Sequence, residues 1–311
     1  MKGLKVIQAA NFNCVFGKEK DIPMLKEFKR IVFPAFKNGK KEYQNSIIKK
    51  LFFSEIKIFE TNLGYCLYGK IIKDIDLVIK NKLDSKGNLI DVDDKVSSAP
   101  YSEFILILKN HKMLFTPSQP GSPTLHDFKN LINHSITNII KINDIREGKR
   151  RLNFKLDIFE IPEEIALEKK LSKFEEIEFF KFEIHPQNSR LFDDDYISKL
   201  EEERKGLGAD KIEQKIFKPS HLERIKKVVL TFKDMAYYTL KGKEKDKEWE
   251  VIKNSTYKKE IEHHFPEANS NSENIRIAVN IVASQDKRIV EVDKDNTLVY
   301  NEALNSIKSL E

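Results

Sequence analysis

The chain has 311 residues, of which 40% are hydrophobic and 33% are charged, and its formal net charge at pH 7 is +6. This composition excludes disordered chains, which carry fewer apolar residues, and collagen-like or low-complexity polymers, which carry far more glycine and proline. The length suffices for one large domain or two ordinary domains, each with its own hydrophobic core.

The chain is expected to begin with a strand, a helix and a hairpin. Lys5–Ala9 is predicted to form a short strand. Asp21 and Pro23 mark the start of a helix, because aspartate caps helix N-termini and proline fits the first turn. Residues 54–61 and 65–72 have strand-like patterns and are joined by a short loop that contains glycine. They are therefore expected to form a β-hairpin.

The next segment predicts a second hairpin followed by a helix. Asp91–Ser98 is polar and is expected to form a loop. Phe104–Leu108 and Met113–Thr116 are expected to pair, and the first of them is apolar on both faces, as a central strand would be. The turn-rich segment Pro117–Pro123 leads into a helix, since apolar residues recur at helical spacing between Leu125 and Ile140.

The second half alternates between strand-like and helix-like segments. Strands are predicted at 153–159, 177–184, 211–217, 236–241, 248–252 and 288–292, and helices at 162–174, 194–205, 220–233 and 301–310. The basic segment Arg146–Arg151 separates the halves, which predicts a basic N-terminal α+β domain at 1–148 and a C-terminal α+β domain at 149–311. The expected fold class is α+β, with antiparallel hairpins in the N-terminal half and β-α alternation in the C-terminal half.

The charge is distributed unevenly along the chain. Residues 1–150 carry +10 and the remainder carries −4. Such asymmetry favours contact between the basic half and a polyanion, DNA or RNA, because nucleic-acid affinity depends mainly on phosphate contacts. The candidate phosphate-binding residues are Lys26, Lys29, Arg30, Lys37, Lys40 and Lys41, with a second patch of Lys149, Arg150 and Arg151. The alternative is an ordinary solvated face in a lysine-rich chain.

Two other functions stay open. A metal-dependent nuclease would use Asp194, Glu213 and Lys215, since carboxylates beside a lysine can hold Mg²⁺ and position water against phosphorus. Asp194 can also be explained as a helix cap. The spacing of Glu213 and Lys215, Glu-x-Lys, is expected to recur by chance in a chain with so many charged residues. Alternatively, the acidic second half docks on a protein partner encoded in the same operon. The sequence leaves open whether any reaction is catalysed.

The remaining features favour a cytoplasmic protein without a cofactor. No stretch approaches the 18–20 apolar residues that roughly span a membrane, and the first residues lack the pattern of a secretory signal. Only two cysteines occur, Cys14 and Cys66, which implies no disulfide framework. Residues 64–70 match the glycine and lysine positions of a phosphate-binding loop, but Ile71 replaces the required hydroxyl residue. No cofactor is expected beyond Mg²⁺ for the nuclease alternative.

Several short segments together resemble an uncharacterised family of bacterial proteins. The segments are Ser54–Thr61 with Gly64 and Gly69, then Ala99–Ser102, Lys109–Lys112 and Gly121–Pro123. That family is associated with mobile-element and phage-defence gene neighbourhoods. The resemblance implies an accessory or sensor role in a prokaryotic antiviral defence system, and it carries over no catalytic residues.

Overall fold

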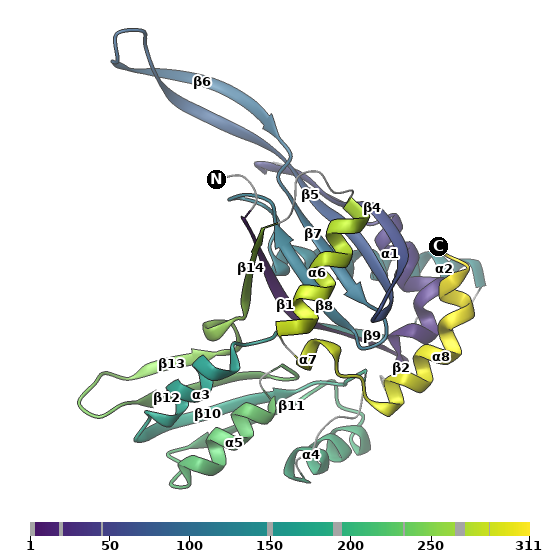
Figure 1. Ribbon diagram of the computed structural model, residues 1–311, viewed down its shortest axis with the longest axis vertical. Coiled ribbons are helices and arrows are strands. Elements are labelled where there is room, and N and C mark those ends of the chain that lie inside the picture. The colour runs from purple at the N-terminus through teal and green to yellow at the C-terminus, as the bar shows by residue number, and fades with distance from the viewer. Residues whose placement is uncertain are drawn as a thin grey trace.

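The computed structural model describes residues 4–18, 21–44, 46–147, 152–188, 195–232, 234–264, 271–285 and 287–311. Within these ranges the chain forms two antiparallel sheets with helices packed against them, which confirms the predicted α+β class (Figure 1). None of the described helices is both long and apolar enough to cross a membrane.

The larger sheet takes strands from both ends of the chain. Its described strands are β1 (Leu4–Phe16), β2 (Ile22–Pro23), β3 (Lys40–Glu42), β4 (Ile48–Thr61), β5 (Gly64–Leu83), β6 (Leu89–Ser98), β7 (Tyr101–Ile107), β8 (Lys112–Pro117), β9 (Phe154–Glu160) and β14 (Glu260–His264). The central order is β14-β1-β8-β7-β5-β4-β3, and β9 pairs with β1. Both predicted hairpins are confirmed, and β7 lies between β5 and β8 as its apolar sequence predicts.

The smaller sheet lies in one continuous segment of the chain. Its order is β11 (Ile212–Phe217), β10 (Glu176–Ile184), β12 (Tyr237–Lys243) and β13 (Glu250–Lys253). The helices of this segment are α3 (Glu164–Ser172), α4 (Asp195–Gly206), α5 (Leu222–Phe232) and the 3-10 helix η3 (Asn254–Tyr257). The larger sheet thus contains strands from both sides of the expected boundary between residues 148 and 149. The segment that carries the smaller sheet is inserted between β9 and β14.

Both faces of the larger sheet are covered. The helical segment η1 (Met24–Glu27), η2 (Phe28–Val32) and α1 (Phe33–Lys37) packs on one face together with α2 (Leu125–Glu147) and α8 (Lys294–Lys308). The other face packs against α6 (Asn271–Gln285) and α7 (Lys287–Val290). Successive strand residues point to opposite faces, so the two faces have separate cores. The strand expected at 288–292 is wrong, because residues 288–290 belong to α7, from which Ile289 buries its side chain, and residues 291–292 lie outside any strand.

Helix α2 is central to the larger core. Thr124 caps its start, since the backbone N–H of Asp127 donates to the Thr124 hydroxyl. Phe128 is fully buried and lies among five other phenylalanine rings, with centroid distances from 4.9 to 6.4 Å. Those rings belong to Phe12, Phe36, Phe53, Phe104 and Phe115.

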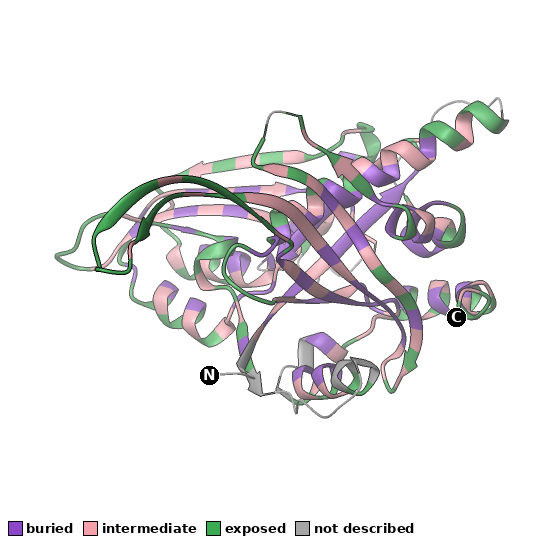
Figure 2. Ribbon diagram, turned by 90° about the horizontal axis from the view of Figure 1, so that it is seen from above, coloured by how far each residue is buried: buried purple, intermediate pink, exposed green. Residues whose placement is uncertain are grey.

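Strands β5 and β6 extend beyond the body of the protein as a two-stranded arm (Figure 1). The loop expected at Asp91–Ser98 is therefore wrong, because these residues belong to β6. The strand lies in an exposed ribbon and needs no buried apolar face (Figure 2). Its polar sequence therefore lacks the apolar pattern by which a strand is predicted. Leu83 and Leu89 face each other near the tip and are about 70% exposed.

Candidate functional site

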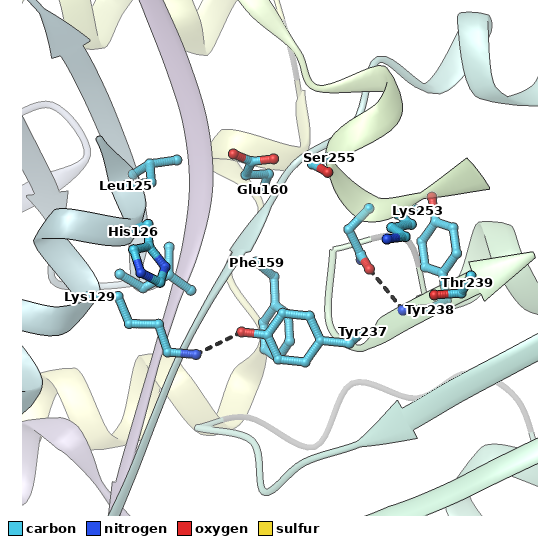
Figure 3. Close-up of a pocket in the computed structure, with 12 residues that line it drawn as sticks. Leu125, His126, Lys129, Phe159, Glu160, Tyr237, Tyr238, Thr239, Lys253 and Ser255 are labelled. Atoms are coloured by element: carbon cyan, nitrogen blue, oxygen red, sulfur yellow. Dashed lines mark hydrogen bonds between the residues drawn. The ribbon is translucent and has the colours of Figure 1, made fainter. Parts of the chain in front are cut away.

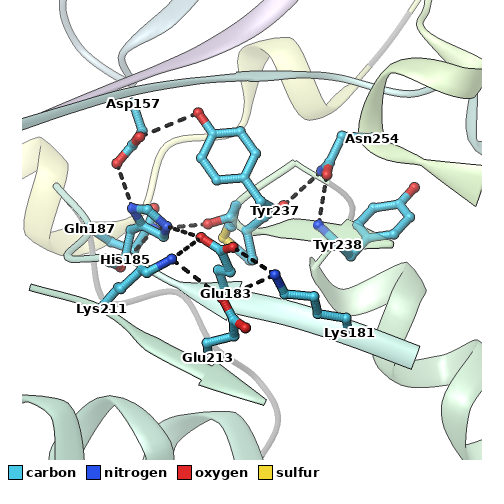
Figure 4. Close-up of polar contacts among 12 residues, drawn as sticks. Asp157, Lys181, Glu183, His185, Gln187, Lys211, Glu213, Tyr237, Tyr238 and Asn254 are labelled. Atoms are coloured by element: carbon cyan, nitrogen blue, oxygen red, sulfur yellow. Dashed lines mark hydrogen bonds and ion pairs between the residues drawn. The ribbon is translucent and has the colours of Figure 1, made fainter. Parts of the chain in front are cut away.

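A buried polar cluster joins the two sheets. Asp157 comes from β9 of the larger sheet, while His185 follows β10 and Tyr237 begins β12 of the smaller one (Figure 4). The Asp157 carboxylate lies 2.9 Å from His185 Nδ1 and 3.0 Å from Lys129 Nζ on α2. The Tyr237 hydroxyl accepts from Lys129 at 2.9 Å and donates to Asp157 at 3.3 Å. We call these four residues the junction cluster.

The electrostatics of the junction cluster favour an ionised Asp157. Burial alone would raise the pKa of this carboxyl, but the hydrogen bond with His185 and the charges of His185 and Lys129 outweigh it and lower the pKa. Burial raises the pKa of Tyr237, and the charge of Asp157 adds to this effect. Tyr237 therefore stays a neutral hydrogen-bonding group. Because the junction cluster contains residues from both sheets, its hydrogen bonds connect one sheet to the other.

His185 is held between two carboxylates. Its Nε2 atom lies 3.3 Å from Glu183, which also accepts from Lys211 at 2.9 Å. Burial opposes ionisation of Glu183, yet these contacts prevail and lower its pKa to about 2. Both ring nitrogens of His185 therefore contact a carboxylate, one from each sheet.

Two of the predicted nuclease residues, Glu213 and Lys215, lie on the exposed strand β11 beside this network. Glu213 forms ion pairs with Lys181 at 3.1 Å and Lys211 at 3.4 Å. The Lys215 ammonium lies 4.4 Å from the ring centroid of Phe179. Among the described residues no group of three or more His, Cys, Asp or Glu side chains could hold a metal ion. Asp194 lies outside the described residues, so the nuclease and its Mg²⁺ stay predictions.

A cavity of about 560 Å³ lies beside the junction cluster (Figure 3). We call it the junction cavity, and it is lined by Leu125, His126, Lys129, Ile158, Phe159, Glu160, Tyr237, Tyr238, Thr239, Lys253, Asn254 and Ser255. Two of its buried polar atoms, Glu160 Oε2 and the Tyr238 hydroxyl, have no hydrogen-bond partner in the described part of the chain. Burial and the charge of Glu260 raise the pKa of Glu160, although Lys258 opposes them.

The predicted basic residues fall into two neighbourhoods. Lys26 pairs with Glu302 of α8, and Lys29 donates to Ser309 at 2.9 Å. Arg30 pairs with Glu27 at 2.8 Å. Carboxylates therefore offset the charges of Lys26 and Arg30, whereas Lys29 contacts an uncharged hydroxyl.

The second neighbourhood forms around a cavity of about 490 Å³. We call it the basic cavity, and it is lined by Pro34, Ala35, Asn38, Lys40, Lys41, Glu42, His134, Ser135, Asn138, Ile139 and Ile142. Lys40 is exposed, and its ammonium lies 3.7 Å from the Glu42 carboxylate. Lys37 is exposed at the end of α1. The structure thus places Lys40 and Lys41 together, while Lys149, Arg150 and Arg151 lie outside the described residues.

Sequence reasoning missed the polar residues at the junction of the two sheets. Asp157, Glu160 and His185 stand alone in the sequence, and no short spacing pattern links them. Asp157 lies inside a predicted strand, whereas Glu160 and His185 each follow one, so the strand pattern gives no sign that they lie near the junction between the sheets. Comparison of the chain with known protein families, curated proteins and solved structures finds no match.

Proposed function

We propose that the chain binds nucleic acid at the basic cavity, where Lys40 and Lys41 contact phosphates. The observation that carries the proposal is an open cavity lined by the adjacent lysines Lys40 and Lys41 together with amide and imidazole groups. Phosphate contacts from lysine supply most of the affinity of such interfaces, and polar side chains position the strand.

Cationic side chains lie near His134 at the basic cavity, which the carboxylate of Glu42 also lines. Burial lowers the pKa of His134, and the nearby charges of Lys41 and Lys141 lower it further. Nearby cations that disfavour protonation of His134 also favour the binding of an anion. The neutral imidazole can also accept or donate a hydrogen bond to a sugar or base, and it already lies 3.0 Å from Asn138.

The cavity also offers groups that suit the rest of a nucleotide. Asn38 and Asn138 provide amide donors and acceptors, and Ile139 and Ile142 provide apolar surface. The Lys41 ammonium lies 5.1 Å from the ring centroid of Tyr43, which holds the side chain beside the cavity. Cations, amides and apolar surface together are typical of sites that follow a phosphate backbone.

Fluorescence anisotropy with labelled single- and double-stranded DNA and RNA tests the proposal. We expect Lys40→Gln/Lys41→Gln to weaken binding about 10-fold or more, since two phosphate contacts are lost. The matched control is Lys245→Gln, an exposed lysine in the turn between β12 and β13, which should leave the affinity unchanged. Equal losses in both variants would show that only overall charge matters, and absence of binding at low salt would remove the proposal.

The wider biological role rests on the family resemblance. The proposal is compatible with an accessory or sensor component of an antiviral defence system, which would meet foreign nucleic acid in the cytoplasm. Co-purification of the native operon products tests for a protein partner. A stable complex whose nucleic-acid affinity resides wholly in the partner would favour the interaction-subunit alternative.

A further inference from the structure

The smaller sheet ends at an exposed edge strand, β11 (Figure 1). In the described part of the chain β11 pairs with β10 and with no other strand. Its residues Glu213, Lys215 and Phe217 are exposed, and Phe217 is 65% exposed. An uncovered strand edge presents a row of backbone donors and acceptors to which another strand can be added.

The hydrogen-bond pattern shows which residues of β11 present these groups. The backbone N–H of Lys218, which follows β11, donates to the Glu178 carbonyl at 2.9 Å. Residues that bond to the neighbouring strand alternate with residues that do not. The even-numbered residues of β11 therefore bond to β10, while the N–H and C=O groups of Glu213, Lys215 and Phe217 point to the outer edge. An added strand would bond to these three residues.

The charges on the edge restrict which strand can be added. Lys215 has no carboxylate partner among the described residues, and its ammonium lies 4.7 Å from the ring centroid of Phe217. Glu213 lies two residues away and therefore on the same face of the sheet. A lysine alone protects an edge against pairing. An acid and a base at this spacing instead make the edge complementary to a second copy of itself in antiparallel orientation.

One register of the two copies satisfies both the backbone and the charges. When the two-fold axis passes through Gln214, each Glu213 lies opposite Lys215 of the second copy, and all four residues present backbone groups to the edge. Ile212 then lies opposite Ile216 on the other face, where both are half-buried in the single chain and would lose further contact with water. An axis through Lys215 would place two lysines opposite each other, which is unfavourable.

We propose that β11 pairs with β11 of a second copy of this chain, in antiparallel orientation about a two-fold axis at Gln214. The smaller sheets of the two copies then form one continuous sheet, and the interface is the same surface on both copies. Exposed ion pairs contribute little affinity, so the Glu213 and Lys215 pairs select the register. Backbone hydrogen bonds and the pairs of Ile212 with Ile216 supply the attraction.

Charge reversal tests the pairing, with sedimentation velocity as the measurement. The dilution series should span roughly 1 to 100 μM, because an interface below the standard size is expected to be weak. Glu213→Lys and Lys215→Glu should each weaken dimerisation about 10-fold or more, since each places like charges opposite one another on both sides of the axis. The matched control is Lys245→Glu, a reversal at an exposed lysine in the turn between β12 and β13, which should leave the dimer unchanged.

An equimolar mixture of Glu213→Lys and Lys215→Glu provides the decisive comparison. The lysines of one variant then face the glutamates of the other at both positions, so the mixture should dimerise as the wild type does. Because misfolded chains could not restore the dimer, this result also shows that both variants fold.

Cysteine placement tests the register. Across the axis, the Cα atoms of position 214 in the two copies should be about 4.5 Å apart, within the range of a disulfide. Those of position 215 lie diagonally, roughly 7 to 8 Å apart. Mild oxidation should therefore cross-link Gln214→Cys but not Lys215→Cys, and the native Cys14 and Cys66 are buried.

The outcomes separate this inference from the proposed function. A monomer at every concentration overturns the β11 interface, as does a dimer that survives both charge reversals. A mixture that stays monomeric, or cross-linking of Lys215→Cys in place of Gln214→Cys, overturns the register. Lys40→Gln/Lys41→Gln should dimerise like the wild type, so its loss of nucleic-acid binding concerns the basic cavity alone.

Discussion

Asp157→Asn should weaken the attachment of the smaller sheet to the larger one. The side chain is 1% exposed and is contacted by Lys129, His185 and Tyr237. Asparagine preserves the volume but removes the charge, which leaves the Lys129 ammonium without its anionic partner. Removing one partner of a buried ion pair costs about 3 to 5 kcal/mol. Because the Lys129 side chain is 32% exposed and can turn toward water, we expect a loss of about 2 to 3 kcal/mol.

This destabilisation should depend on pH. The folded-state pKa of Asp157 lies below its ordinary value of 3.8. A carboxyl with a lowered folded-state pKa stabilises the fold above its unfolded-state pKa, and this contribution is lost as pH falls through the folded-state value. The difference in unfolding free energy between wild type and Asp157→Asn should therefore be complete at pH 7 and should shrink as pH falls below 3.8.

Urea unfolding followed by two probes measures the effect. The single tryptophan, Trp249, contacts Lys241 and Lys243 of the smaller sheet, so its fluorescence reports on that sheet. Far-UV circular dichroism reports on the whole chain. In the variant we expect the fluorescence transition to precede the dichroism transition. Glu213→Gln is the control, because it breaks only exposed ion pairs and should cost less than about 1 kcal/mol. Equal stability of Asp157→Asn and wild type at pH 7, or the same difference at pH 3 and pH 7, would refute the reasoning.

Three further changes test the packing of the larger sheet. Phe128→Ala should cost about 3 to 5 kcal/mol, because it leaves a cavity among the surrounding rings, and a smaller loss by chemical denaturation would argue against that core. Gly69→Ala should cost about 1 to 3 kcal/mol, since a Cβ there would lie 2.6 Å from the Phe104 ring, and an unchanged melting temperature would contradict this close approach. Replacing residues 77–96 of the arm by an Asn-Gly turn should shift the melting temperature by no more than about 2 °C, because exposed residues add little stability, and a larger fall in calorimetry would show that the arm supports the body.

Elements with a buried face were predictable because burial leaves a periodic pattern in the sequence. The apolar stripe of α2 and the two hairpins around β5 and β7 follow from that pattern. β6 has no buried face, so its polar residues resembled a loop. β14 and α6 also escaped prediction. β14 is short, with its register set by β1, and only part of α6 faces the core.

The sites were less predictable than the fold because they depend on contacts between distant segments. Charge counting identified Lys40 and Lys41, which line a cavity, but it also selected Lys26 and Arg30. A carboxylate pairs with each of the latter two, and the one beside Lys26 comes from the opposite end of the chain. No short sequence pattern shows that a carboxylate from a distant segment neutralises a basic residue. The buried, unpartnered side-chain oxygen of Glu160 is likewise visible only in the structure.

The salt dependence of nucleic-acid binding tests the central claim most directly. The logarithm of the affinity should fall linearly with the logarithm of salt concentration, and each phosphate contact contributes roughly 0.7 to 0.9 to the slope. We predict that Lys40→Gln/Lys41→Gln reduces the steepness of that slope by about 1.5, whereas Lys245→Gln leaves it unchanged. An identical slope for wild type and the double variant would contradict phosphate binding at the basic cavity.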